Sequence, residues 1–151
     1  MDLIILCGLQ ASGKTTFRDT MLTEDYFVVS KDLMGRSRKN KGAHQEMLIR
    51  DALGRGYSVI VDNTNPSLED RAALILIGRQ YQVKRVIGYH FRSTVQQSIE
   101  RNALRVGKAF VPRVAIFSTS KAFVSPMLGE GFDELYEVLW GPNNTFIKAR
   151  V

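Results

Sequence analysis

Near the start of the chain, a complete phosphate-binding loop is present: Gly8-Leu-Gln-Ala-Ser-Gly-Lys14-Thr15 fits the pattern G-x-x-x-x-G-K-[ST]. Its two glycines let the backbone wrap round a phosphate with the N–H groups pointing inward. The lysine of this pattern reaches the β- and γ-phosphates, and the Ser/Thr hydroxyl ligates Mg²⁺. The motif therefore predicts a nucleoside triphosphate site in which Lys14 is catalytic and Thr15 holds the metal. The predicted nucleotide-binding residues are Gly8, Ala11, Ser12, Gly13, Lys14, Thr15 and Thr16.

Two carboxylates are placed to work with this loop. Asp32 comes just after the strand-like run at 26–30, and Asp62 ends another such run. Asp32 could accept the proton of an acceptor hydroxyl or align that hydroxyl by hydrogen bonding, and an aspartate that caps a turn is the alternative interpretation. Asp62 is placed like the carboxylate that holds water on Mg²⁺. A structural role in capping the loop at 62–65 is the alternative for Asp62.

Two arginines supply the positive charge that phosphate transfer needs. Arg101 and Arg105 are four residues apart, so on a helix they share one face. The guanidinium fork fits phosphate oxygens. Because Gly107-Lys108 follows directly, we expect a lid around residues 101–112 that closes on the triphosphate. A solvated basic face is the alternative.

These residues must be positioned by alternating strands and helices. The apolar runs and capping residues predict strands at 2–7, 26–30, 57–61, 83–91 and 132–140, with a short edge strand at 145–151. Helices are expected at 15–22, at 43–53, from an Asn65 cap to about 80, after a Ser93/Gln96 capping box, and at 112–123.

This alternation predicts an α/β fold of the P-loop NTPase type. The sheet should be doubly wound, parallel and mainly five-stranded, with helices on both faces. Ligands in such folds bind at the carboxyl ends of the strands. The phosphate loop, Asp32 and Asp62-Asn63 each follow a strand, so we expect them to meet along one rim.

Composition limits the class of protein. The chain has 151 residues, 44% of them hydrophobic and 24% charged, which suits one domain over 1–151. Cys7, the single cysteine, has no partner for a disulfide, which fits a reducing compartment. There is neither a basic leader nor a stretch of about 20 apolar residues. We therefore expect a cytoplasmic protein that does not bind membranes.

The charge of the chain favours a polyanionic partner. The formal net charge is +6 and the isoelectric point is about 9.7. The basic residues gather in two segments: Lys31, Arg36, Arg38, Lys39 and Lys41 in one, and Arg101, Arg105, Lys108 and Arg113 in the other.

Over nearly its whole length, the chain resembles the kinase domain of polynucleotide 5′-hydroxyl kinases. The resemblance rests on the phosphate loop, Asp32-Leu-Met-Gly35, Val61-Asp-Asn-Thr-Asn-Pro66, Arg71, Glu100-Arg-Asn102 with Arg105, Val111-Pro112, and Pro126-Met-Leu-Gly-Glu-Gly-Phe132. The chain departs from the family at Gly35, where the phage form has an arginine. The lid also has one extra residue around Val106-Gly107, and no D-x-D-x-T-like phosphatase motif is present.

The resemblance implies a role for each matched residue. Lys14 and Thr15 would bind ATP·Mg²⁺, Asp32 would be the general base, and Arg101 with Arg105 would clamp the phosphates. The acceptor would be the 5′-OH end of DNA or RNA, and a separate end-healing phosphatase or ligase is the implied partner. The substrate-binding residues implied are Arg36, Arg38, Asn63 and Arg71.

Two other functions remain open from the sequence. The same scaffold could phosphorylate a small hydroxyl compound such as a nucleoside, a sugar or an antibiotic, because fold does not settle function. Alternatively, the chain could be an NTP-binding regulatory module that transfers no phosphate.

Overall fold

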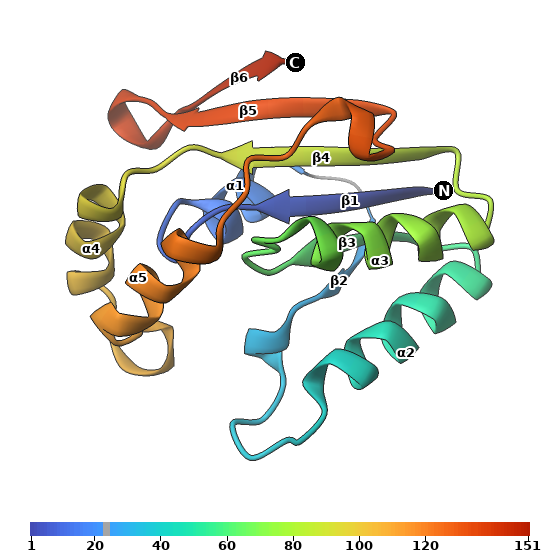
Figure 1. Cartoon of the computed structure of the whole chain (residues 1–151), viewed down its shortest axis with the longest axis horizontal. Coiled ribbons are helices and arrows are strands. Elements are labelled where there is room, and N and C mark those ends of the chain that lie inside the picture. The colour runs from blue at the N-terminus through green and yellow to red at the C-terminus, as the bar shows by residue number, and fades with distance from the viewer. Residues whose placement is uncertain (23–24) are drawn as a thin grey trace.

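A six-stranded sheet forms the centre of the molecule in the computed structural model, which describes residues 1–22 and 25–151 (Figure 1). The strand order is β2-β3-β1-β4-β5-β6, and all neighbours pair in parallel except β5 and β6. The strands are β1 (Asp2–Cys7), β2 (Tyr26–Val29), β3 (Ser58–Asp62), β4 (Arg85–Phe91), β5 (Glu134–Trp140) and β6 (Phe146–Arg150). The predicted α/β fold with a doubly wound, mainly parallel sheet is confirmed.

Helices cover both faces of the sheet. They are α1 (Lys14–Met21), α2 (Lys41–Gly54), α3 (Leu68–Gln80), α4 (Val95–Ala103) and α5 (Arg113–Ala122). Successive residues of β1 point to opposite faces, as in any strand. Leu3 and Ile5 therefore join the core under α2 and α3, whereas Ile4 and Leu6 pack with Phe17 of α1. The central strand β1 is buried along its whole length.

Three strands end at the same level, and this forms the rim. Leu6 of β1 pairs with Asp62 of β3, and Val29 of β2 pairs with Val61 of β3. The phosphate loop, Asp32 and Asp62 consequently emerge side by side, as the sequence predicted. Helices α4 and α5 lie beyond the arrowheads of β1 and β4, at this same end of the sheet (Figure 1).

Helix α3 starts two residues later than predicted. Its N-cap is Ser67, whose hydroxyl accepts a hydrogen bond from the backbone N–H of Asp70. Asn65, the predicted cap, is buried with a positive φ of 44°. Its side-chain amide donates to the carbonyl of Leu6, 2.7 Å away. Asn65 cannot cap the helix because its side chain ties the end of β1 to the loop after β3.

Helix α4 has a capping box one residue further along than predicted. Thr94 and Gln97 form the reciprocal pair, in place of Ser93 and Gln96. The Ser93 hydroxyl instead lies 2.8 Å from the hydroxyl of Ser98, a fully buried residue of α4. This contact fixes Ser93 outside the helix.

The chain ends in a β-hairpin, so the predicted edge strand is confirmed. The backbone N–H of Gly141 donates to the carbonyl of Thr145 at 2.7 Å, and β6 then runs antiparallel to β5. Trp140 and Phe146 stack across the hairpin with ring centroids 5.5 Å apart. Phe146 also packs edge-on against Phe17 of α1, which places the hairpin aromatics beside the phosphate loop.

Among the described residues, no helix combines the length and the apolar character that crossing a bilayer demands.

Candidate active site

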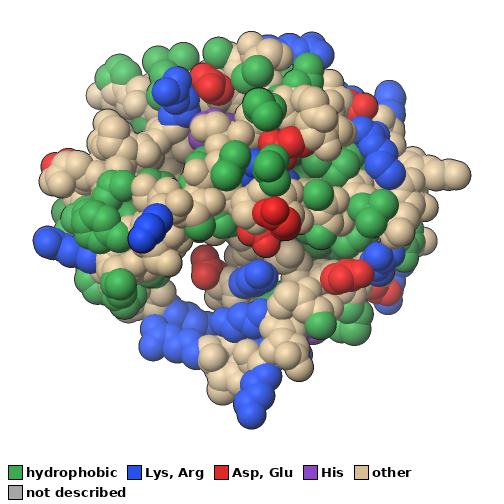
Figure 2. Space-filling view, in the orientation of Figure 1, with side chains coloured by type: hydrophobic (Ala, Val, Ile, Leu, Met, Phe, Trp, Pro, Cys, Tyr) green, Lys and Arg blue, Asp and Glu red, His purple; other side chains and the backbone are tan. Residues whose placement is uncertain are grey.

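A cleft of about 980 Å³ opens at the carboxyl ends of the strands. Its walls come from the phosphate loop, the segment after β2, the first turns of α2 and α3, and the lid. Figure 2 shows a hollow in the lower half of the molecule with Lys and Arg side chains gathered below it. Lys14, Asp32, Asp62 and Arg105 all line this cleft, so the structure brings together the central residues predicted from the sequence.

The phosphate loop has the backbone conformation that its glycines allow. Ala11 and Gly13 have positive φ values of 57° and 100°. Gly13 is the N-cap of α1, so the positive end of the helix dipole faces the cleft. A Cβ atom on Gly13 would lie 2.9 Å from the ring of Trp140. Glycine is therefore required at this position by both the backbone and the neighbouring aromatic ring.

The ammonium group of Lys14 is held by the loop itself. It donates hydrogen bonds to the carbonyls of Gly8 and Leu9 at 2.9 and 2.7 Å, and the residue is buried. Burial lowers the pKa of Lys14 to about 8. Phosphate oxygens of a bound nucleotide would replace these carbonyls and favour the charged form again.

Asp62 lies beside Thr15, the other residue predicted to hold magnesium. The Thr15 hydroxyl donates to Asp62 Oδ2 at 2.9 Å. Asp62 is buried, and burial raises the pKa of its carboxyl group while the charge of Lys14 lowers it. A hydroxyl and a carboxylate side by side offer the hard oxygen donors that Mg²⁺ prefers, so the residues present fit this metal.

Arg18 is a member of the site that the sequence analysis missed. Its Nη1 donates to the same oxygen, Asp62 Oδ2, at 3.0 Å. Arg18 stands four residues after Lys14 in α1, so the two side chains share a helix face. This four-residue spacing is the feature of the sequence that could have identified Arg18 as part of the site.

Asp32 presents its carboxylate to the cleft. It lies in a short 3-10 helix, η1 (Lys31–Leu33), which is capped by the hydroxyl of Ser30. In the described ranges, 1–22 and 25–151, no hydrogen bond or ion pair engages the Asp32 carboxylate. The turn-capping alternative is therefore wrong for this side chain, because Ser30 performs the capping.

Asn63 connects three elements around the cleft. Its Oδ1 accepts a hydrogen bond from the backbone N–H of Lys31 at 2.9 Å, and its amide donates to Gln45 of α2. It lines the cleft, but its side chain is engaged in holding η1 and α2 at the end of β3. Asn63 thus positions the segment that carries Asp32.

Arg71 lies away from the cleft, in contrast to its predicted contact with substrate. The residue is fully buried in α3, and its guanidinium donates to Glu130 and to the carbonyls of Asn65 and Pro66. All of this hydrogen bonding is internal to the fold. The structure therefore assigns Arg71 to holding the segment before β5 against α3.

The two lid arginines have different surroundings. Helix α4 ends at Ala103, so Arg105 lies beyond it and the predicted shared helix face does not form. Arg105 lines the cleft, where burial lowers its pKa and the charges of Asp32 and Asp62 raise it. Arg101 instead covers the ring of Trp140, with its Cζ 4.6 Å from the centroid. Only Arg105 of this pair lies beside the predicted base.

Asn102 braces the lid, a role the sequence analysis did not assign. It is buried, its amide donates to the Val111 carbonyl at 2.7 Å, and its Oδ1 accepts from the Val111 N–H at 3.0 Å. These two bonds close the loop that carries Arg105 and Lys108. Within the loop, Arg105 Nη1 also donates to the carbonyl of Ala109 at 3.1 Å.

The basic segment after β2 contributes unequally to the cleft. Lys31, Arg36 and Lys41 line it. Arg38 is exposed and lies outside the lining residues. Of the two arginines predicted to contact the acceptor, Arg36 has the better position.

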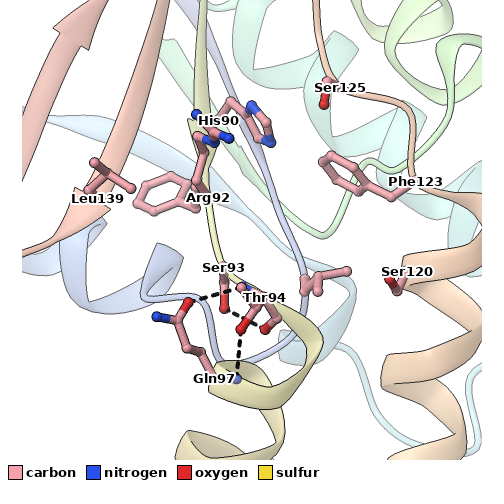
Figure 3. Close-up of a pocket in the computed structure, with 11 residues that line it drawn as sticks. His90, Arg92, Ser93, Thr94, Gln97, Ser120, Phe123, Ser125 and Leu139 are labelled. Atoms are coloured by element: carbon pink, nitrogen blue, oxygen red, sulfur yellow. Dashed lines mark hydrogen bonds between the residues drawn. The ribbon is translucent and has the colours of Figure 1, made fainter.

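A second cavity, of about 400 Å³, lies between the end of β4 and the C-terminal half of α5 (Figure 3). His90 and Phe123 stack at one side with ring centroids 5.4 Å apart, and burial lowers the pKa of His90. Ser93, Thr94 and Gln97 form the hydrogen-bonded wall opposite. No carboxylate or lysine is among its described lining residues, whereas Lys14, Asp32 and Asp62 line the larger cleft.

Comparison with known proteins places the fold and the family. Residues 3–126 match the model of the AAA domain family. The chain is 28% identical over 141 residues to a bifunctional polynucleotide phosphatase/kinase of Schizosaccharomyces pombe, and 24% identical over 143 residues to a putative one of Acanthamoeba polyphaga mimivirus. Each alignment covers 91% of this chain and 33% of the relative. The chain thus spans about a third of the length of these relatives.

Solved structures agree with this placement. A chain of the Pnkp1/Rnl/Hen1 RNA repair complex superposes with a TM-score of 0.65 at 26% identity, over 80% of this chain and 43% of that one. A fungal RNA kinase superposes with a TM-score of 0.70 over 91% of this chain and 38% of that one. At 15% identity, the latter shows the fold alone. With its phosphate loop at the head of α1 and a family match over most of its length, the chain belongs to the AAA domain family of P-loop proteins.

Proposed function

We propose that this protein transfers the γ-phosphate of ATP to a hydroxyl group, and that the acceptor is the 5′-OH end of a polynucleotide. One observation carries the proposal: Asp32, whose carboxylate has no hydrogen bond or ion pair among the described residues, lines the same cleft as Lys14, the Thr15–Asp62 pair and Arg105. The names of the curated relatives, polynucleotide phosphatase/kinases, support the choice of acceptor.

Each group has a defined part in the reaction. The loop N–H groups and Lys14 would hold the β- and γ-phosphates, and Thr15 with Asp62 would hold Mg²⁺, which neutralises phosphate charge when bound. Asp32 would accept the proton of the acceptor hydroxyl as its oxygen forms a bond to the γ-phosphorus and the bond to ADP breaks. Arg105 would stabilise the charge that spreads over the transferred group.

The lid surface supports a nucleic acid acceptor over a small molecule. Val106 and Phe110 are 85% and 49% exposed, and they alternate along the lid with Arg105, Lys108 and Arg113. An exposed aromatic ring such as Phe110, on which a base can stack, set among phosphate-binding cations, is typical of single-strand binding. A gluconokinase shares the fold at 15% identity, so small-molecule transfer is the competing outcome to test.

The test is a transfer assay with Mg²⁺ and γ-labelled ATP. The acceptors are 5′-OH DNA, 5′-OH RNA, the same oligonucleotides already 5′-phosphorylated, a nucleoside and gluconate. We expect label on the 5′-OH oligonucleotides alone, and on neither phosphorylated control. Label on gluconate or the nucleoside alone would establish the small-molecule function, and hydrolysis without any transfer would contradict the proposal.

We further propose that the protein works with a separate phosphatase or ligase. The relatives of this chain combine kinase with phosphatase in their names, and one matching structure is an RNA repair complex. A kinase that prepares 5′-phosphate ends supplies the substrate of a ligase. Co-purification of the tagged chain from its source organism, followed by ligation assays on the eluate, tests this association.

A further inference from the structure

Arg18 connects two carboxylates beside the proposed metal site. Its Nη1 lies 3.0 Å from Asp62 Oδ2, and its Nε lies 2.8 Å from Asp19 Oδ1. The Arg18 side chain lines the cleft and is largely buried, whereas Asp19 is exposed. The guanidinium thus joins a buried acid inside the site to a solvated acid outside it.

Asp62 needs this positive partner because a buried carboxylate is costly when its charge is uncompensated. Lys14 does not supply it by direct contact, since its ammonium donates to the carbonyls of Gly8 and Leu9 and to the Ser12 hydroxyl. In the described part of the chain, Arg18 is the only cationic side chain that forms an ion pair with Asp62.

The metal and Arg18 would meet at one carboxylate. Asp62 Oδ2 accepts both the Thr15 hydroxyl and the Arg18 guanidinium. A cation held by Thr15, with Asp62 binding its water, would therefore arrive beside the positive charge of Arg18. Two cations around one buried carboxylate repel each other strongly, because the low dielectric of the site screens them little.

We propose that Arg18 is the counter-ion of Asp62 in the metal-free protein. The ion pair between the two side chains breaks when magnesium and nucleotide bind together. Asp19 retains the guanidinium at the edge of the cleft during this exchange. The inference rests on the proposed function only in assuming a metal–nucleotide site. Its consequence is that Arg18 sets the magnesium concentration at which the site fills.

The experiment measures ADP binding by calorimetry across a series of Mg²⁺ concentrations, with no acceptor present. The variants are Arg18→Gln, which removes the charge at similar length, Arg18→Lys, which keeps it, and Arg55→Ala. Arg55 forms an exposed i,i+4 ion pair with Asp51 on α2 and serves as the matched control.

For Arg18→Gln we expect the half-saturating Mg²⁺ concentration to fall about fivefold, the effect of removing one competing ion pair. ADP binding in EDTA should weaken, because Asp62 then faces the phosphates without its counter-ion. Arg18→Lys and Arg55→Ala should stay within about twofold of wild type. Thermal unfolding at a fixed ADP concentration and increasing Mg²⁺ gives a second readout, in which the Tm of Arg18→Gln should begin to rise at a lower Mg²⁺ concentration than that of wild type.

An unchanged Mg²⁺ midpoint in Arg18→Gln, with ADP still bound, would overturn the counter-ion role and leave the proposed function intact. A wild-type protein that binds no ADP at any Mg²⁺ concentration would overturn the proposed function itself. The two failures are therefore distinguishable.

Discussion

Arg71 and Glu130 are joined by two parallel hydrogen bonds across 59 positions of the sequence, from Nε to Oε1 at 2.8 Å and from Nη2 to Oε2 at 3.2 Å. Glu130 also accepts the backbone N–H of Met127, and the pair is almost completely shielded from solvent. This contact fixes the segment that crosses the sheet between α5 and β5. Bidentate geometry makes it one of the stronger ion pairs available to a protein.

Breaking this pair should destabilise the fold. Arg71→Ala leaves the Glu130 carboxylate buried without its cation, so we expect the free energy of unfolding to fall by about 3 to 5 kcal/mol. Urea titration followed by circular dichroism measures it. Arg55→Ala, which removes an exposed pair, should change the value by less than about 1 kcal/mol. A loss of similar size in both variants would contradict the structural role of Arg71.

Nucleotide binding should take up protons at alkaline pH. The pKa of buried Lys14 is about 8, below its ordinary 10.5. At pH 8.5 much of the free protein therefore has a neutral Lys14, and phosphate oxygens raise the pKa and restore the proton. Calorimetry of ADP binding in buffers of different ionisation enthalpy counts this uptake. The Lys14→Arg side chain cannot lose its charge in this pH range. This variant should therefore lack the proton uptake that Lys14 causes on ADP binding.

The same pKa shift predicts how stability depends on pH. Because Lys14 has a lower pKa in the folded than in the unfolded state, the unfolded state binds more protons between about pH 8 and 10.5. The contribution of Lys14 to stability therefore rises with pH through this window. Urea unfolding of wild type and Lys14→Met at pH 7.5 and 9.5 isolates it. If the free energy of unfolding of wild type increases between these pH values no more than that of Lys14→Met, the lowered pKa of Lys14 is refuted.

Asp32→Asn should slow phosphate transfer without weakening nucleotide binding. Removing a general base lowers turnover by about 10² to 10⁴. Within residues 1–22 and 25–151, no hydrogen bond or ion pair of the Asp32 carboxylate holds the fold. Single-turnover labelling of 5′-OH oligonucleotide and ADP calorimetry measure the two properties. Asp51→Asn, on the exposed side of α2, is the control. Undiminished transfer by Asp32→Asn would remove Asp32 from the mechanism.

Arg105→Ala should impair transfer more than Arg101→Ala. Arg105 lines the cleft, and losing one group that stabilises developing charge costs about 10² to 10³ in rate. Arg101 packs on Trp140 outside the cleft lining, so its removal should cost less than about tenfold. Steady-state kinetics of both variants test this order. The reverse order would show that the lid closes with Arg101, not Arg105, on the phosphates.

Asn102→Ala should loosen the lid. It leaves the N–H and carbonyl of Val111 without their partners, at a cost of about 1 to 3 kcal/mol. Trypsin should then cut faster at Arg105 and Lys108, and the KM for oligonucleotide should rise more than kcat falls. Gln96→Ala, at an exposed site of the same helix, should be cleaved at the wild-type rate. Equal cleavage rates of Asn102→Ala and wild type would contradict the role of Asn102 in holding the lid.

Much of the site could be predicted because its residues are set by local sequence. The phosphate loop directly follows β1, Asp62 is the last residue of β3, and Asp32 lies in the short helix just after β2. Parallel strands of matched register bring such residues together. Arg18 was also accessible, through its four-residue spacing from Lys14.

The remaining features depend on contacts between distant residues. The position of Arg105 depends on where α4 ends and on the clasp between Asn102 and Val111. Arg71 was predicted to bind substrate, and only the position of Glu130, 59 residues away in the sequence, shows its buried ion pair. The predicted caps of α3 and α4 differ from the observed ones by two positions and one position. Adjacent polar residues compete as caps, and a contact such as that between Ser93 and Ser98 decides which of them caps the helix.

Trp140, the chain's single tryptophan, stacks on Phe146 and lies close to both the guanidinium of Arg101 on the lid and the backbone of Gly13 in the phosphate loop. The emission of an indole depends on the groups that surround the ring. The protein therefore carries its own optical reporter, and stopped-flow emission can separate the arrival of nucleotide from the movement of the lid without an added dye.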